Sequence, residues 1–338
     1  MSSYIETLVS GLREKGYRDQ YINLCVEYCE RLINNNLPVI FDKDHLALVM
    51  GVRDKYLAKL FMFPEKFYKQ ARIPKKKKGE YREISIPYQT LKHLQRWILE
   101  NILYRLKVSD SSKGFVPNLS IVENANKHLQ KECVINIDIK DFFPSIQFNE
   151  IFNIFYYYGY TKEISFILAR LCTYEGRLPQ GSPASPYLSN LVNIKLDRRF
   201  ENFCKKIGAD YTRYADDITI SGPKYISKYI HQLKEIITDE GYNLNEEKTR
   251  ILFKHQRQEV TGLIVNEVLG VPIKMKKYLR QQIHYCKKFG VSNHLMKIGN
   301  QRSNFKEHLF GLAYYIKMVE KEKGEKFIED LNTLNWDY

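Results

Sequence analysis

The stretch DYTRYADDITIS, residues 210–221, decides the fold class. Apolar and polar residues alternate on both sides of its centre, as they do in two strands joined by a tight turn. Asp216 and Asp217 stand side by side at that turn, and adjacent like charges repel unless a counter-ion compensates them. Two interpretations are equally open: an ordinary turn, where aspartate is common, or a site for divalent cations.

A further acidic position lies upstream, in CVINIDIKDFF, residues 133–143. This apolar run predicts a buried strand, in which Asp138 needs an ionic partner or a metal ion because an isolated buried charge is very unfavourable. A strand with one carboxylate and a hairpin with two at its turn can place these groups around two Mg²⁺ ions. Such a centre stabilises the attacking and leaving oxygens of phosphoryl transfer.

The whole chain is basic and long enough for a sizeable core. Its 338 residues include 53 Lys and Arg against 39 Asp and Glu, for a net charge of +14, and 44% are hydrophobic. The charge favours a polyanionic partner, of which nucleic acid is the commonest. No apolar run approaches the ~18 residues of a membrane span, and the N-terminus lacks the pattern of a signal peptide. We therefore expect a cytoplasmic protein with reduced cysteines and no membrane contact.

The order of the elements predicts an α+β fold, since antiparallel hairpins are mixed with helices. A basic hairpin is expected over 66–87, where eight Lys or Arg and one acid fall between Lys66 and Arg82. One amphipathic helix is expected over 187–206, and a helical, basic pattern runs from 274 to the end. The segment LPQGSP, residues 178–183, predicts a loop in which backbone groups can approach a sugar or base closely.

In this order the elements resemble those of reverse transcriptases over about residues 70–330. Two strings, NANKH at 124–128 and VTG at 260–262, resemble the NAxxH and VTG patterns of the retron branch. The resemblance implies a right-hand polymerase fold with fingers, palm and thumb. An N-terminal helical region would span 1–65, fingers and palm 66–258, and a primer-grip hairpin with a basic helical thumb 259–338.

The resemblance also implies a catalytic centre with two Mg²⁺ ions. Asp138 and Asp216 would be the direct metal ligands, with Asp217 beside them. The backbone of Ile139 would add a carbonyl ligand. Lys248 matches the lysine proposed to protonate the leaving pyrophosphate.

A nucleotide site for dNTPs is implied in the same way. Arg82 matches the fingers arginine that binds the triphosphate, and Phe143 matches the aromatic gate that collides with a ribose 2′-OH. Gln180 and Gly181 would line the pocket. One residue of the lysine run Lys75, Lys76, Lys77 and Lys78 would join Arg82, and the run does not show which.

Further residues are expected to contact RNA or DNA, through the two retron-like strings and through a basic helix with interleaved rings. They are His128, Val260, Thr261, Gly262, Lys276, Lys277, Arg280 and Lys287. For His128, a hydrogen-bonded structural role is an equally open reading.

The function implied is that of a retron reverse transcriptase. Such an enzyme copies part of a cognate structured non-coding RNA into branched multicopy single-stranded DNA (msDNA), primed from an RNA 2′-OH. The partners implied are that RNA, the RNA–DNA duplex, dNTPs and an effector protein in anti-phage defence. Two alternatives are a group II intron-like or diversity-generating reverse transcriptase, and a non-catalytic RNA-binding scaffold, which the intact acidic residues count against.

Overall fold

The computed structural model of the protein describes residues 2–74, 79, 81–299 and 304–336. Helices and short antiparallel sheets are combined, so the expected α+β class is confirmed. The chain forms two interleaved compact units. The first comprises Met1–Phe115, Ile139–Arg199 and Ile237–Asn243; the second comprises Val116–Asp138, Phe200–Ile236 and Leu244–Tyr338. The division into three consecutive segments, with its fingers, palm and thumb, stays a prediction.

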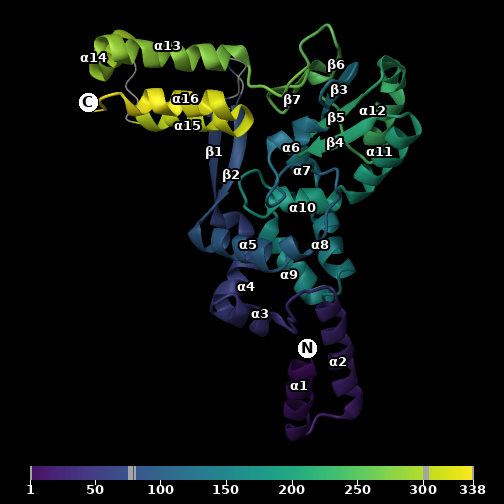
Figure 1. The fold of residues 1–338 in the computed structure, drawn as a ribbon. Coiled ribbons are helices and arrows are strands. Elements are labelled where there is room, and N and C mark those ends of the chain that lie inside the picture. The colour runs from purple at the N-terminus through teal and green to yellow at the C-terminus, as the bar shows by residue number, and fades with distance from the viewer. Residues whose placement is uncertain (1, 75–78, 80, 300–303, 337–338) are drawn as a thin grey trace. The chain divides into compact units, whose positions relative to one another are not determined.

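The first unit is mostly helical (Figure 1). It begins with α1 (Ser2–Glu14), α2 (Asp19–Asn34), α3 (Lys43–Val49), α4 (Asp54–Met62) and the 3₁₀ helix η1 (Pro64–Phe67). Strands β1 (Tyr68–Pro74) and β2 (Tyr81–Pro87) then form the expected basic hairpin, followed by α5 (Gln89–Asn101) and η2 (Leu103–Arg105). Helices α7 (Phe142–Ser145), α8 (Phe148–Tyr157), α9 (Lys162–Cys172) and α10 (Ser185–Val192) complete it.

The single helix expected over 187–206 is in fact two helices, α10 and α11 (Ile194–Lys206). The break lies at Asn193, whose backbone leaves the helical region. The side chain of this residue donates a hydrogen bond to the Ser189 carbonyl at 2.8 Å. Asparagine competes with the backbone for helical hydrogen bonds in this way, which the apolar periodicity of the segment does not reveal.

The second unit is built around a four-stranded antiparallel sheet in the order β4-β5-β3-β6 (Figure 1). The strands are β3 (Cys133–Asp138), β4 (Asp210–Tyr214), β5 (Asp217–Gly222) and β6 (Arg250–Phe253), and α6 (Ile121–Asn126) precedes β3. The central position of β3 explains its apolar sequence, because both faces are covered and Val134, Ile135 and Ile137 are fully buried. Helix α11 packs on β4 through the stacked rings of Phe200 and Tyr211.

The other elements of the second unit lie between β5 and β6 or after β6 in the chain. They are η3 (Lys224–Tyr229), α12 (Ile230–Asp239, whose end belongs to the first unit), η4 (Glu246–Lys248), β7 (Glu259–Val260), β8 (Leu263–Ile264), α13 (Ile273–Phe289), α14 (Val291–Lys297), α15 (Phe305–Val319) and α16 (Lys321–Asn332). One apolar core joins the β7–β8 hairpin to α13, α15 and α16. Helices α15 and α16 meet at Gly324, where an added Cβ would lie 2.2 Å from the Cα of Lys317.

Candidate active site

The acidic turn is a two-residue connection between β4 and β5. Tyr214 pairs with Asp217, which leaves Ala215 and Asp216 as the loop residues. Ala215 has a φ of 56°, a left-handed conformation that is strained for a residue with a side chain. Its carbonyl accepts a hydrogen bond from Nη1 of the fully buried Arg213 at 3.3 Å. The turn is therefore held from within the sheet.

The sheet register brings the predicted carboxylates together. Asp138 on β3 is directly opposite Asp217 on β5, the residue next to Asp216. Side chains opposite each other in an antiparallel pair lie about 4.5–5.5 Å apart at their Cβ atoms. Residues from two distant parts of the sequence thus form one acidic cluster within the second unit.

Lys248 is the cation of this cluster. Its Nζ lies 3.0 Å from Oδ1 and 2.8 Å from Oδ2 of Asp138. The backbone N–H of Asn245 donates to the Asp138 carbonyl at 2.8 Å, and this contact aligns the 245–248 segment with the end of β3. The ionic partner that a nearly buried Asp138 requires is therefore this lysine.

The electrostatics of the cluster favour a bound cation. Burial raises the pKa of Asp217 to about 6, with further contributions from Asp216 and Asp138 and a smaller opposing effect of Lys248. A carboxylate in this environment is unfavourably charged at neutral pH, and a divalent ion would offset that cost.

The donor set fits Mg²⁺ of the kind bound together with substrate. Among the residues that the structure describes, no group of three or more His, Cys, Asp or Glu side chains is arranged to hold a metal ion. Mg²⁺ in phosphoryl-transfer sites commonly takes only one or two carboxylates and completes its shell with water and substrate phosphates. Asp138 and Asp216 could supply those carboxylates, and Ile139 directly follows Asp138 in the chain.

The predicted nucleotide residues lie in the first unit, where the 178–183 loop docks on β2. The Gln180 carbonyl accepts a hydrogen bond from the Ser85 N–H at 2.8 Å. At Gly181, with a φ of 125°, an added Cβ would lie 2.6 Å from the Ser85 carbonyl oxygen. Glycine is thus required for this close approach. Arg82 is exposed on the same strand, three residues before Ser85.

Phe143 is connected to the same loop through backbone contacts. It lies on α7, and the Leu178 N–H donates to the Ile146 carbonyl just after this helix at 3.0 Å. The ring is partly exposed and contacts Phe142 and Phe115. The first unit thereby places Phe143, the Gln180–Gly181 pair and the strand of Arg82 in one connected region. Lys75, Lys76, Lys77 and Lys78 lie outside the described residues.

The expected nucleic-acid contact of His128 is wrong, because its side chain is completely buried. Its Nδ1 lies 2.7 Å from the Ser221 hydroxyl and its Nε2 lies 2.7 Å from the Thr212 hydroxyl. Both ring nitrogens are therefore occupied within the protein. Burial lowers the pKa of His128 to about 3, so the ring is neutral.

The expected contact through the Val260 side chain is wrong for the same reason, since it is fully buried in the core around β7 and β8. Thr261 and Gly262 form the two-residue turn of this hairpin, with φ of 45° and 85°. Positive φ at both positions is the type I′ pattern favoured in hairpins. These two residues are partly exposed, so their contact with nucleic acid stays a prediction.

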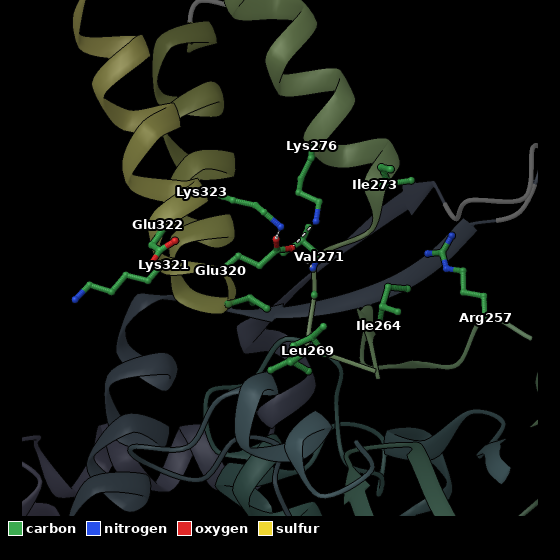
Figure 2. Close-up of a pocket in the computed structure, with 13 residues that line it drawn as sticks. Arg257, Ile264, Leu269, Val271, Ile273, Lys276, Glu320, Lys321, Glu322 and Lys323 are labelled. Carbon is green, nitrogen blue, oxygen red and sulfur yellow. Dashed lines mark hydrogen bonds and ion pairs between the residues drawn. The ribbon is translucent and has the colours of Figure 1, made fainter. Parts of the chain in front are cut away.

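The basic residues of α13 differ in their availability. Figure 2 shows Lys276 and Lys323 directed at Glu320, whose carboxylate also accepts the Val271 N–H at 2.8 Å. Both lysine–carboxylate distances are 2.6 Å. Lys276 is therefore part of an internal ion-pair network beside a cavity of about 670 Å³.

The other three predicted cations of α13 are exposed. Lys287 pairs with Asp330 at 2.7 Å. Within the described ranges, Lys277 and Arg280 form no ion pair, and they present their charge outward.

Sequence reasoning missed Arg213 and Glu320. Arg213 lies in DYTRY, residues 210–214, a strand of mixed polarity in which a charged residue is only a weak signal of burial. Glu320 gave no such signal, because it stands among charged residues in VEKEKGEK, residues 319–326.

Comparison with known proteins identifies the family of the chain. The family described as "Reverse transcriptase (RNA-dependent DNA polymerase)" matches residues 73–266, more than half of the chain. The chain is 34% identical to the retron Ec86 reverse transcriptase of Escherichia coli over 312 residues, which cover 91% of this chain and 94% of that protein. It is 32% identical to the retron Mx162 reverse transcriptase of Myxococcus xanthus over 346 residues, which cover 90% of this chain and 69% of that protein.

A solved structure of Candida albicans telomerase with a fragment of telomeric RNA aligns with 80% of this chain and 61% of that chain. Its TM-score is 0.44 at 12% identity, a likeness too distant to support an inference. In the described part of the chain, no helix has the length and apolar character needed to cross a membrane. The family match and the identity to retron enzymes together establish that the chain belongs to the reverse transcriptases, as an RNA-directed DNA polymerase of the retron type.

Proposed function

We propose that the protein copies part of a cognate structured RNA into branched msDNA, starting from a 2′-OH of that RNA. The single observation that carries the proposal is the acidic cluster of Asp138, Asp217 and Lys248 in a chain similar to retron enzymes over most of its length. By the same similarity, the product complex would restrain an effector protein in anti-phage defence, and the enzyme would act in the cytoplasm.

In the proposed reaction, the primer hydroxyl loses its proton to solvent water and its oxygen attacks the α-phosphorus of a dNTP. One phosphodiester bond forms, one phosphoanhydride bond breaks, and pyrophosphate leaves. Two Mg²⁺ ions, when bound, would lower the charge on the attacking and leaving oxygens. Asp138 and Asp216 would hold them with the Ile139 carbonyl, while Asp217 contributes negative charge beside them. Lys248 would leave the Asp138 carboxylate as metal binds and donate its proton to the pyrophosphate.

The residues of the first unit would select and orient the nucleotide. Arg82 would bind triphosphate oxygens, since a guanidinium offers a planar set of donors that matches phosphate. Gln180 and Gly181 would contact the sugar or base, and Phe143 would exclude a ribose 2′-OH. A lysine of the 75–78 run would add charge near Arg82.

The cognate RNA would be bound by the exposed cations Lys277, Arg280 and Lys287 together with the Thr261–Gly262 turn. Cations alone give affinity that depends on salt but not on sequence. The interleaved rings of Tyr285 and Phe289, stacked 6.1 Å apart, offer surfaces for unpaired bases. This combination supports recognition of a folded RNA rather than of a plain duplex.

The decisive experiment is to purify the protein from cells that contain its native locus and to sequence the nucleic acid that copurifies. We expect one DNA species joined to one RNA through a 2′–5′ linkage, which a debranching enzyme releases. Linear cDNA of varied sequence would favour an intron-like or diversity-generating enzyme instead.

A Mg²⁺-dependent primer-extension assay separates the polymerase from a non-catalytic scaffold. The D216N/D217N variant should make no DNA. Asp110→Asn is a matched control, because it removes an exposed carboxylate that is 88% accessible and lies in the first unit. Equal activity of the double variant and this control would refute the proposed catalytic centre.

A further inference from the structure

Residues 124–132 comprise the end of α6 and the loop from this helix to β3, and they contact two hairpins of the second unit. One is the β4–β5 hairpin with the acidic turn, and the other is the β7–β8 hairpin. We call this segment the connector. The comparisons and the proposed chemistry give it no role, and neither hairpin is adjacent to it in sequence.

The connector contacts the acidic hairpin through His128. The two hydroxyl partners of the ring come from different strands, Thr212 from β4 and Ser221 from β5. Thr212 is four residues before Asp216, and Ser221 is four residues after Asp217. Thr212 is two residues from the end of β4 and Ser221 is four residues from the start of β5, which is about 7 Å and about 13 Å along the strands at about 3.3 Å per residue. His128 therefore joins the middle of β4 to the part of β5 that lies away from the carboxylates.

A second contact between the connector and this hairpin is an ion pair. Lys131 Nζ lies 2.7 Å from Oδ2 of Asp210, the first residue of β4. Both side chains are about one-third accessible, so this pair contributes less than the fully buried contacts of His128.

The connector contacts the other hairpin at three points. Asn124, which is buried, donates from Nδ2 to the Thr261 hydroxyl at 3.3 Å. The Gln130 N–H donates to the Val265 carbonyl at 2.9 Å, and Gln130 Nε2 donates to the Glu267 carbonyl at 2.7 Å. The turn of this hairpin and the chain after β8 are thus bound to the connector.

We propose that the connector fixes the acidic turn relative to the β7–β8 hairpin, with His128 and Asn124 as positioning residues for DNA synthesis. This inference rests on the metal-binding role proposed above for Asp216 and Asp217. Neither positioning residue touches the acidic pair, so both act through the strands.

The physical reason is that buried polar contacts select one arrangement. Sliding either strand past His128 would leave buried hydroxyls and ring nitrogens unpaired, and a buried polar group without a partner is unfavourable. Apolar packing of the same volume tolerates small shifts much better. Small shifts matter at a reacting centre, because a misplacement of about 1 Å can lower the rate about 100-fold.

The test is a variant that keeps the volume and removes the polarity: H128L with T212V and S221A. Replacing all partners by apolar groups leaves no orphaned donor, so the variant should fold with nearly unchanged stability. We expect kcat for primer extension to fall at least about tenfold and the half-saturating Mg²⁺ concentration to rise several-fold, with the KM for dNTP nearly unchanged. His128→Gln, which can still bond to both hydroxyls, should retain most of kcat.

A matched control is Gln95→Leu in the first unit. Gln95 is also fully buried and also bridges two elements, through hydrogen bonds to the Tyr68 hydroxyl at 2.7 Å and the Leu171 carbonyl at 2.8 Å. Its loss should lower stability without changing the Mg²⁺ dependence. An effect of both variants on the Mg²⁺ dependence would show a general response to core damage and would overturn the inference.

Normal kcat and normal Mg²⁺ dependence in the triple variant would mean that His128 only fills the core. If the triple variant does not fold, T212V and S221A are measured singly, and wild-type values for both would refute the positioning role equally. The D216N/D217N variant is assayed alongside. Its activity reports on the proposed metal site, so that failure of that site and failure of the connector are distinguished.

Discussion

The neutral His128 ring should make the second unit sensitive to mild acid. The pKa of this histidine is about 3 in the folded protein, against 6.5 for the exposed side chain. Its folded pKa is lowered, so the unfolded chain takes up a proton first as the pH falls below about 6.5. The contribution of the neutral ring to the free energy of unfolding is fully present above that pH and is lost progressively as the pH falls to about 3.

The magnitude at pH 5 follows from the unfolded chain alone, because the folded ring is still neutral there. The pKa of 6.5 in the unfolded chain lies 1.5 above pH 5. This difference corresponds to a loss of about 2 kcal/mol in the free energy of unfolding. Nearby Asp210, Lys127 and Lys131 influence the ring, but burial is the largest cause of the lowered pKa. This loss is a large fraction of the stability of a typical domain.

The assay compares wild type with His128→Gln, which does not titrate, in urea unfolding at pH 7.5, 6 and 5. Other groups titrate over this range, among them Asp217, whose raised pKa acts in the opposite direction. Their contributions cancel when the difference between the two proteins is taken at each pH. We expect the wild-type advantage to shrink by about 2 kcal/mol between pH 7.5 and pH 5. A difference that stays constant within about 0.5 kcal/mol would refute the burial of a neutral His128.

Four further outcomes are expected. The D216N/D217N variant should lose DNA synthesis yet be at least as stable as wild type in metal-free buffer at pH 7.5, because the raised pKa of Asp217 means that its charge opposes folding there; a lower melting temperature would contradict this. Phe143→Ala should increase ribonucleotide incorporation, measured by alkaline cleavage of the product, and unchanged discrimination would exclude Phe143 as the gate. Arg82→Ala should raise the KM for dNTP about tenfold at unchanged melting temperature, since Arg82 is exposed; lower RNA affinity at an unchanged KM would assign it to the template. Glu320→Gln should destabilise the second unit by about 2 kcal/mol at pH 7 and by less at pH 4. The reason is that the ion pairs that lower the pKa of Glu320 stabilise the wild-type protein less in acid, and thermal unfolding at the two pH values tests this.

The parts of the site that could be predicted from sequence are those with a local signal. The turn at Asp216 and Asp217 is evident from alternation on both sides, and Asp138 is evident as a charge in an apolar strand. The sheet register then places these groups together. Only the resemblance to reverse transcriptases pointed to Lys248, because no local pattern links it to a carboxylate 110 residues away.

His128 shows why the rest could not be predicted. Its partners are 84 and 93 residues distant, and a histidine that binds RNA looks the same in sequence as one that is buried between two hydroxyls. Lys276 shows the same limit for a cation: its helical spacing matches that of the exposed Arg280, but Glu320 pairs with it from 44 residues away. Spacing defines the face of a helix, whereas tertiary contacts decide which charges remain available.

The central position of β3 has a consequence for synthesis on the ribosome. Both neighbours of this strand, β5 and β6, are made after it, and the pairing of Cys133 with Phe253 closes the last ladder. At a synthesis rate of about 5–20 residues per second, β3 remains with unpaired edges for on the order of ten seconds after it is made. An apolar strand with free edges is a template for association with other chains. Until residue 253 has left the exit tunnel, the nascent protein should therefore depend on chaperones or on a low local concentration of other nascent copies to avoid association.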